Sequence, residues 1–138
     1  MRSLAEIGAN LEHGDAAASP AAMARDFLAA GEEVLENWLA AHGLEPTQGR
    51  SEGFRLLALH RQAARGNPSF NACRETCREL VYHYNVVAAE PDGVDTLARA
   101  TMMRFVLNHL YLFISGKMEV AGLGEFCCSS RDLRTESA

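Results

Sequence analysis

Cys73 and Cys77 are the residues of this sequence whose type and spacing first suggest chemistry. Two side chains four positions apart share one face of a helix, and two thiolates placed in this way can ligate one metal ion. Their Cβ atoms would lie about 5–6 Å apart, whereas a disulfide needs about 3.5–4.5 Å. A buried free cysteine also serves simply as a small apolar residue. The simpler interpretation is therefore packing in the core, and a metal-binding or redox pair is the alternative.

A second pair of cysteines, Cys127 and Cys128, lies near the C-terminus of the chain. If this segment folded back, it would complete a four-thiolate site with Cys73 and Cys77, a set that suits Zn or Fe. The spacings do not match the paired Cys-x-x-Cys pattern of zinc sites, and exposed thiols can instead form an oxidation-sensitive pair. We expect no cofactor, with a Zn or Fe site at these four cysteines as the alternative.

Three histidines, His60, His83 and His109, fall inside predicted helices. His83 is next to Tyr84, and His109 shares an apolar stripe, so that His83, Tyr84 and His109 are candidates to line a small pocket. The same two histidines are candidate ligands for haem or iron. Helical di-iron proteins, however, carry Glu-x-x-His on each of two helices, whereas this chain has Glu79 and His83 four apart, once. A histidine that is hydrogen-bonded or half-exposed is the simpler interpretation at each position.

Motifs of enzyme active sites are missing from the sequence. It contains no Gly-x-Ser-x-Gly nucleophile elbow and no glycine-rich phosphate loop. Nor does any motif point to a particular protein family. A protein without enzyme activity is therefore the simpler interpretation, and an enzyme with a pocket at His83, Tyr84 and His109 is the alternative.

Apolar spacing and capping signals predict the helices that would position these residues. Ser19 and Asn67 each precede a proline, an arrangement that favours the first turn of a helix. A short helix is expected around residues 3–12. Four main helices are expected at 21–42, 51–64, 68–90 and 95–115, the last ended by Gly116. In the third of these main helices, alternating steps of three and four form a seam of Phe70, Cys73, Cys77, Leu80, Tyr84 and Val87.

No segment shows the period-two alternation of a half-buried strand. The fold class predicted from the sequence is therefore all-α, an antiparallel bundle of about four main helices with a short N-terminal helix and a flexible C-terminal tail. We place a single helical domain at residues 1–126 and the tail at 127–138. The last main helix carries more apolar residues than a four-helix core needs.

The charge of the chain limits the classes of partner. A net charge of −5 argues against a module that binds duplex nucleic acid. The sign reverses between residues 51 and 80, where five arginines outnumber three glutamates. The simpler interpretation is that acidic and basic helices lie side by side, and the alternative is an anion-binding or docking face. Without a signal peptide or a long apolar run, we expect a cytoplasmic protein that does not enter a membrane.

These observations favour a non-enzymatic helical accessory or regulatory protein that acts through protein–protein interaction. A protein partner is expected, and a homodimer formed through the apolar last helix is the expected additional contact. The alternative function is a thiol-based metal-binding or redox-sensing helical bundle that uses Cys73 and Cys77.

Overall fold

The computed structural model describes residues 1–13 and 18–122, and within them the chain is helical and has no β-strand. This confirms the all-α prediction for the described residues. None of these helices is both long and apolar enough to cross a membrane. The predicted tail at 127–138, with Cys127 and Cys128, lies outside the described residues. The elements are α1 (Leu4–His13), α2 (Pro20–Ala41), α3 (Arg55–Ala64), the 3-10 helix η1 (Pro68–Cys73), α4 (Arg74–Ala89) and α5 (Thr96–Ala121).

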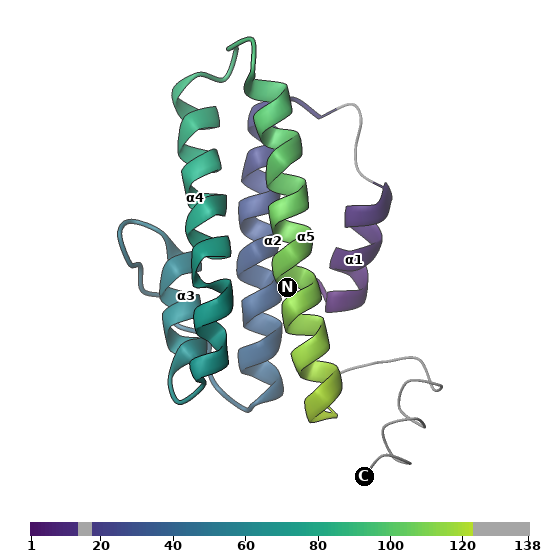
Figure 1. The fold of residues 1–138 in the computed structure, drawn as a ribbon, viewed down its shortest axis with the longest axis vertical. Helices are drawn as coiled ribbons and strands as arrows, with labels where there is room; N and C mark the ends of the chain where they lie inside the picture. The colour runs from purple at the N-terminus through teal and green to yellow at the C-terminus, as the bar shows by residue number, and fades with distance from the viewer. Residues whose placement is uncertain (14–17, 123–138) are drawn as a thin grey trace.

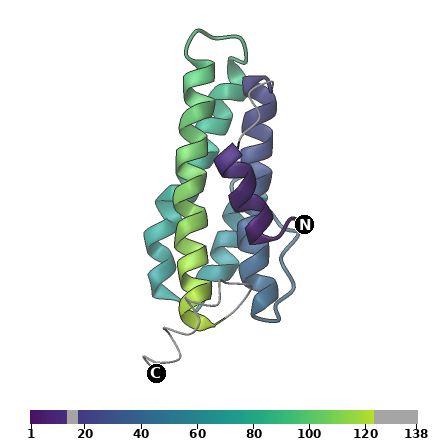
Figure 2. The same cartoon turned by 90° about the vertical axis from the view of Figure 1, so that its right-hand side faces the viewer.

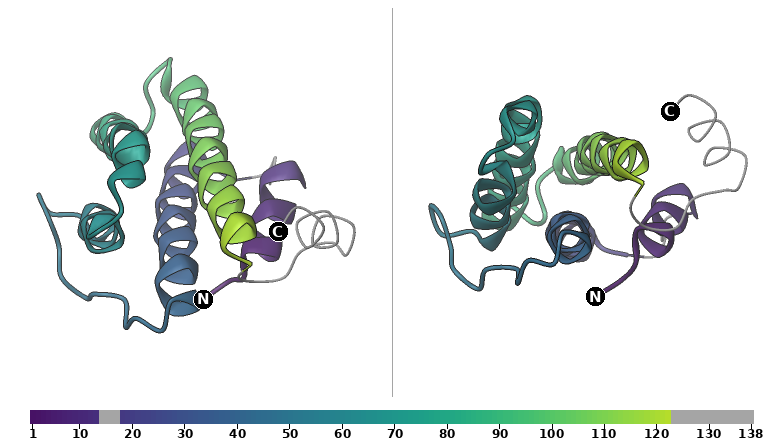
Figure 3. Two further views of the ribbon diagram at one scale, coloured as in Figure 1. Left: turned by 60° about the horizontal axis from the view of Figure 1, so that its bottom comes forward. Right: turned by 90° about the horizontal axis from the view of Figure 1, so that it is seen from below.

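The helices α2 and α5 form a central pair, and the other helices lie on two sides of it. Viewed from below, α3 and α4 lie on one side of this pair and α1 on the other (Figure 3). The chain runs up α4 and down α5, so these two helices are antiparallel, as expected, but α2 and α5 run in the same direction (Figure 1). The reason is the long connection at residues 42–54, which carries the chain back along the bundle before α3 begins.

The first turns of α1 and α2 are capped by serine side chains. The backbone N–H of Glu6 donates to Ser3 Oγ at 3.2 Å, and the Glu6 carboxylate accepts from the Ser3 N–H at 3.2 Å. This reciprocal pair is a capping box. In α2, Ser19 Oγ accepts from the Ala22 N–H at 3.2 Å, and Pro20 occupies the first helical position. The predicted start of α2 is therefore correct.

The short helix α1 lies against α2 and α5 (Figure 2). Arg104 of α5 donates from Nε to the Leu11 carbonyl at 2.8 Å and from Nη2 to the Glu12 carbonyl at 3.1 Å, which satisfies carbonyls at the end of α1. At Gly8 the two helices meet closely, since a Cβ there would lie 2.8 Å from Tyr111 Cζ. A residue without a side chain is what allows α1 to dock here.

Gly31 marks the centre of the core. A Cβ at this position would lie 3.3 Å from Leu56 Cδ1 of α3, 3.4 Å from Leu80 Cδ1 of α4 and 3.8 Å from Leu107 Cδ1 of α5. All three leucines are fully buried. The glycine that would weaken α2 on helix propensity alone is therefore the point at which three other helices approach it.

Three helix boundaries differ from those expected. α3 begins at Arg55 rather than at residue 51, because residues 51–54 form a turn closed by two backbone hydrogen bonds between Ser51 and Phe54. The predicted helix at 68–90 begins as a 3-10 helix, with α4 following from Arg74 to Ala89. The predicted stop at Gly116 is wrong, because α5 continues to Ala121 and ends at Gly122, whose φ of 71° suits a glycine cap. Met118 explains the continuation. It is only 3% exposed, and its burial outweighs the cost of about 1 kcal/mol for a glycine within a helix.

Candidate functional site

Cys73 and Cys77 lie in the core at the junction between η1 and α4. Cys73 is the residue before the first turn of α4, and Cys77 follows one turn later. Both are free thiols, 2% and 0% exposed. When Cys73 is protonated, its thiol donates to the Phe70 carbonyl, with 3.3 Å between sulfur and oxygen. The packing role expected for both cysteines is therefore present, together with a polar contact.

His60 joins this pair from α3. Its imidazole is 6% exposed, and Nε2 lies 2.8 Å from the same Phe70 carbonyl oxygen. One carbonyl thus connects a histidine to a cysteine from a different element. The sequence did not identify His60 as a partner of the cysteines. His60 and Cys73 lie on different elements, so helical periodicity does not show that they are neighbours.

The electrostatics of the cluster favour a negative charge on Cys73. The hydrogen bond from Cys77, with the nearby His60, lowers the pKa of Cys73 to about 5 against the opposing effect of burial. The position at the start of α4 acts in the same direction, since a helix N-terminus stabilises a thiolate. The same contact and burial raise the pKa of Cys77. Although burial opposes it, hydrogen bonding to Cys73 and Phe70 raises the pKa of His60.

The predicted metal site is only partly within the described residues. Cys73 and Cys77 lie one turn apart on one face, but Cys127 and Cys128 lie outside the described part of the chain. Within that part, no three histidine, cysteine, aspartate or glutamate side chains are grouped as metal ligands. The four-cysteine Zn or Fe site therefore stays a prediction.

The three predicted pocket residues lie in three different places. His83 is buried on α4, where its Nδ1 lies 3.2 Å from Arg99 Nη1 of α5. Tyr84 is half-buried and packs edge-to-face on Phe54, with 5.8 Å between ring centroids. His109 lies exposed on the outer side of α5. None of the three lines the cavity of about 410 Å³ between α3 and α4.

The outer face of α5 carries a row of mainly apolar residues with one histidine, and we call this row the α5 seam. Its members follow one another in alternating steps of four and three: Ala98, Met102, Phe105, His109, Leu112 and Gly116. Met102, Phe105 and Leu112 are 48%, 66% and 57% exposed. The inner face of the same helix, including Met103, Leu107 and Leu110, is fully buried. The sequence showed that apolar residues occupy a wide sector of this helix. It did not show that part of this sector would be exposed to solvent.

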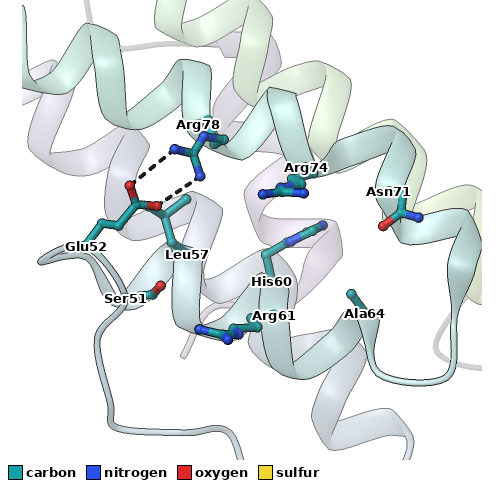
Figure 4. Close-up of a pocket in the computed structure, with 9 residues that line it drawn as sticks. All are labelled: Ser51, Glu52, Leu57, His60, Arg61, Ala64, Asn71, Arg74 and Arg78. Carbon is teal, nitrogen blue, oxygen red and sulfur yellow. Dashed lines mark hydrogen bonds and ion pairs between the residues drawn. The ribbon is translucent and has the colours of Figure 1, made fainter.

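A cavity of about 410 Å³ opens between α3 and α4 (Figure 4). Its walls are rich in basic side chains. The residues that line the cavity are Ser51, Glu52, Leu57, His60, Arg61, Ala64, Asn71, Arg74 and Arg78. His60 therefore has a place both in this wall and in the cysteine cluster behind it. The reversal of charge between residues 51 and 80 was the signal for this feature.

Comparison with known proteins found no matching family model, no matching curated protein and no matching solved structure. Function is therefore argued from the cysteine cluster, the α5 seam and the cavity.

Proposed function

We propose that this bundle of four main helices is a non-enzymatic, cytoplasmic accessory or regulatory protein that acts through protein–protein interaction. We further propose that it forms a homodimer through the α5 seam. The observation that carries the proposal is a row of exposed apolar side chains on a helix whose opposite face already fills the core.

The spacing of the seam supports a helical partner. Alternating steps of three and four residues keep a stripe facing a neighbouring helix over several turns, as in coiled coils. No member of the seam between residues 98 and 116 is an acid, an arginine or a lysine. Apart from His109, the seam is a stripe of apolar residues and one glycine, and contiguous exposed apolar patches mark interaction sites.

The order of residues in the seam supports a second copy of the chain as the partner. In an antiparallel pair of α5 helices related by a two-fold axis near residue 107, Ala98 would face Gly116 of the partner subunit. Met102 would then face Leu112 of the partner subunit, and Phe105 would face His109 of the partner subunit. Small residues meet small ones at both ends, so the helices can approach closely while larger side chains pack between them. Two-fold pairing requires such a self-complementary surface.

Substitution within the seam tests this proposal. We expect the wild-type protein to dimerise with a dissociation constant on the order of micromolar, because a single helix pair buries an area at the low end for specific interfaces. Phe105→Glu should raise the dissociation constant of the dimer by about tenfold or more, since it places a charge in an apolar contact. Sedimentation velocity over a concentration series measures both constants.

Leu44→Glu is the matched control, because Leu44 is 50% exposed but lies in the loop after α2. It should leave the dissociation constant unchanged. A wild-type protein that stays monomeric at every concentration would overturn the dimer, and so would an equal effect of both substitutions.

A second proposed function, a thiol-based redox sensor, is favoured by the position of Cys73. Its sulfur lies at the start of α4 with a second thiol one turn away and His60 behind it. With hydrogen peroxide as the oxidant, the Cys73 thiolate would attack one peroxide oxygen and release hydroxide, which leaves a sulfenic acid. Because the spacing of the two cysteines does not suit a disulfide, the Cys73 sulfenic acid would be the oxidised state, next to the thiol of Cys77. Because both sulfurs are buried, this proposal ranks after the first.

The titration of Cys73 tests the proposed sensor. Thiolate absorbance at 240 nm, recorded with Cys127 and Cys128 replaced by serine, should rise around pH 5. In Cys77→Ala it should rise at higher pH, because the hydrogen bond to the thiolate is lost. The lowered pKa also means that the free energy of unfolding falls as the pH is lowered from about 8.5, the value for an unfolded cysteine, to about 5. A single transition near pH 8.5 in both proteins would contradict the sensor.

A further inference from the structure

The cavity between α3 and α4 combines a hollow that is open to solvent with an unbalanced charge. At about 410 Å³ it lies within the range of sites for small molecules, roughly 300–1,000 Å³. Arg61 projects into its wall from α3, and Arg74 and Arg78 project from α4 (Figure 4). The three guanidinium groups share this wall with a single carboxylate, that of Glu52.

The arginines differ in how they are paired. Arg78 forms a two-pronged ion pair with Glu52, with distances of 2.9 Å from Nη1 and 3.2 Å from Nη2. The side chains of Arg61 and Arg74 form no hydrogen bond or ion pair with any residue in the described part of the chain. Other arginines of the same bundle are used structurally, as Arg55 is between Glu32 and Glu36. Two cationic groups of the cavity are therefore available to a ligand.

Further polar groups complete the wall. Asn71 and Ser51 offer an amide and a hydroxyl, and the largely buried ring of His60 lies between α3 and α4 (Figure 4). Glu75 and Glu79 do not line this cavity but an adjoining hollow, which shares Glu52, Leu57 and Arg78 with it. The cavity thus presents cations and neutral hydrogen-bonding groups, with one acid that is already paired.

From this arrangement we propose that the cavity between α3 and α4 binds a small molecule that carries a phosphate or diphosphate group, held by Arg61 and Arg74. This site is separate from the α5 seam, so it adds a ligand to the proposed interaction protein.

A phosphate fits the cavity better than a single carboxylate does. A phosphate monoester carries a charge of about −1.5 to −2 at neutral pH and has three acceptor oxygens. It can therefore engage two guanidinium groups at once, and the planar arginine fork matches its oxygens in pairs. A monocarboxylate has one negative charge and two oxygens, which suffice for a two-pronged contact with a single guanidinium group. The side chains of Asn71 and Ser51 can supply hydrogen bonds to the rest of the molecule.

Inorganic pyrophosphate is the probe that tests the proposal. Isothermal titration calorimetry with the full chain at low ionic strength should show saturable binding of pyrophosphate and much weaker binding of acetate. Arg74→Gln and Arg61→Gln should each weaken pyrophosphate binding about tenfold to a hundredfold, the usual effect of losing a hydrogen bond to a charged group. Glu52→Gln should strengthen it, because Arg78 would be released from its ion pair.

Arg25→Gln is the matched control, because Arg25 is an exposed arginine on α2 and does not line the cavity. It should change the affinity little. The proposal is overturned if pyrophosphate shows no saturable binding, or if Arg25→Gln weakens it as much as Arg74→Gln does. Since these substitutions lie on α2, α3, α4 and the loop before α3, none of them is on α5, and their outcome is independent of whether the α5 dimer forms.

Discussion

Phe70→Ala is expected to destabilise the fold by about 3–5 kcal/mol, the range for truncating a buried phenylalanine. Phe70 is 0% exposed and lies among three other rings. Its ring centroid is 5.0 Å from that of Trp38, 5.6 Å from that of Phe113 and 6.3 Å from that of His60. These rings come from α2, α5 and α3, so the cavity left by the substitution would separate three helices at one point. The melting temperature should fall by about 10 °C or more.

Phe105→Ala is the matched control for this substitution, because it removes the same side chain at a position that is 66% exposed. At protein concentrations that favour the monomer it should change the free energy of unfolding by less than about 1 kcal/mol. Urea unfolding followed by circular dichroism measures both values. Fluorescence of Trp38, the one tryptophan of the sequence, reports directly on the packing around Phe70. Equal losses of stability for both variants would show that Phe70 does not organise the core.

Gly31→Val is expected to cost about 2–3 kcal/mol, at the upper end for overpacking of a core. A Cβ at this position would already lie 3.3 Å from Leu56 Cδ1 and 3.4 Å from Leu80 Cδ1. The two methyl groups of valine extend beyond that point, so the leucines of α3 and α4 would have to move outward. Chemical unfolding followed by circular dichroism gives the change.

Gly31→Ala separates crowding from helix propensity. Alanine gains about 1 kcal/mol over glycine in a helix, and its single methyl group needs only a small movement of two flexible side chains. We expect it to be close to neutral. Combining Gly31→Val with Leu56→Ala should cost less than the sum of the two separate losses, because the smaller residue makes room for the larger one. If the two losses in the free energy of unfolding were strictly additive, the crowding caused by Gly31→Val would not be against Leu56.

The helices were the most predictable part of this protein. Ser19 before Pro20 marked the start of α2, and the six-residue seam from Phe70 to Val87 identified the buried face of η1 and α4. Local chemistry is sufficient for such elements, because a cap and its helix lie within a few residues of each other. The predicted end of the last helix at Gly116 was wrong, because this boundary does not depend on local chemistry alone. Whether a helix continues through a glycine depends on what the following residues bury, here Met118.

The arrangement of the candidate sites was much less predictable. The spacing of Cys73 and Cys77 showed that they share a face, but not that His60 would approach through the Phe70 carbonyl. That contact depends on the turn between α3 and η1, for which the sequence carries no distance information. The same holds for Arg61 and Arg74. Their charge was visible in the sequence, but the cavity between them exists only because α3 packs beside α4.

The shared direction of α2 and α5 affects the order in which the fold can assemble. The turn at residues 90–95 joins α4 directly to α5, so these helices can pair by closing a short loop. The pairing of α2 with α5 must instead close the whole segment between Ala41 and Thr96, at a greater cost in chain entropy. Contacts that are distant in sequence slow folding. We therefore expect the α4–α5 hairpin to act as the template on which α2, carrying Gly31, docks late.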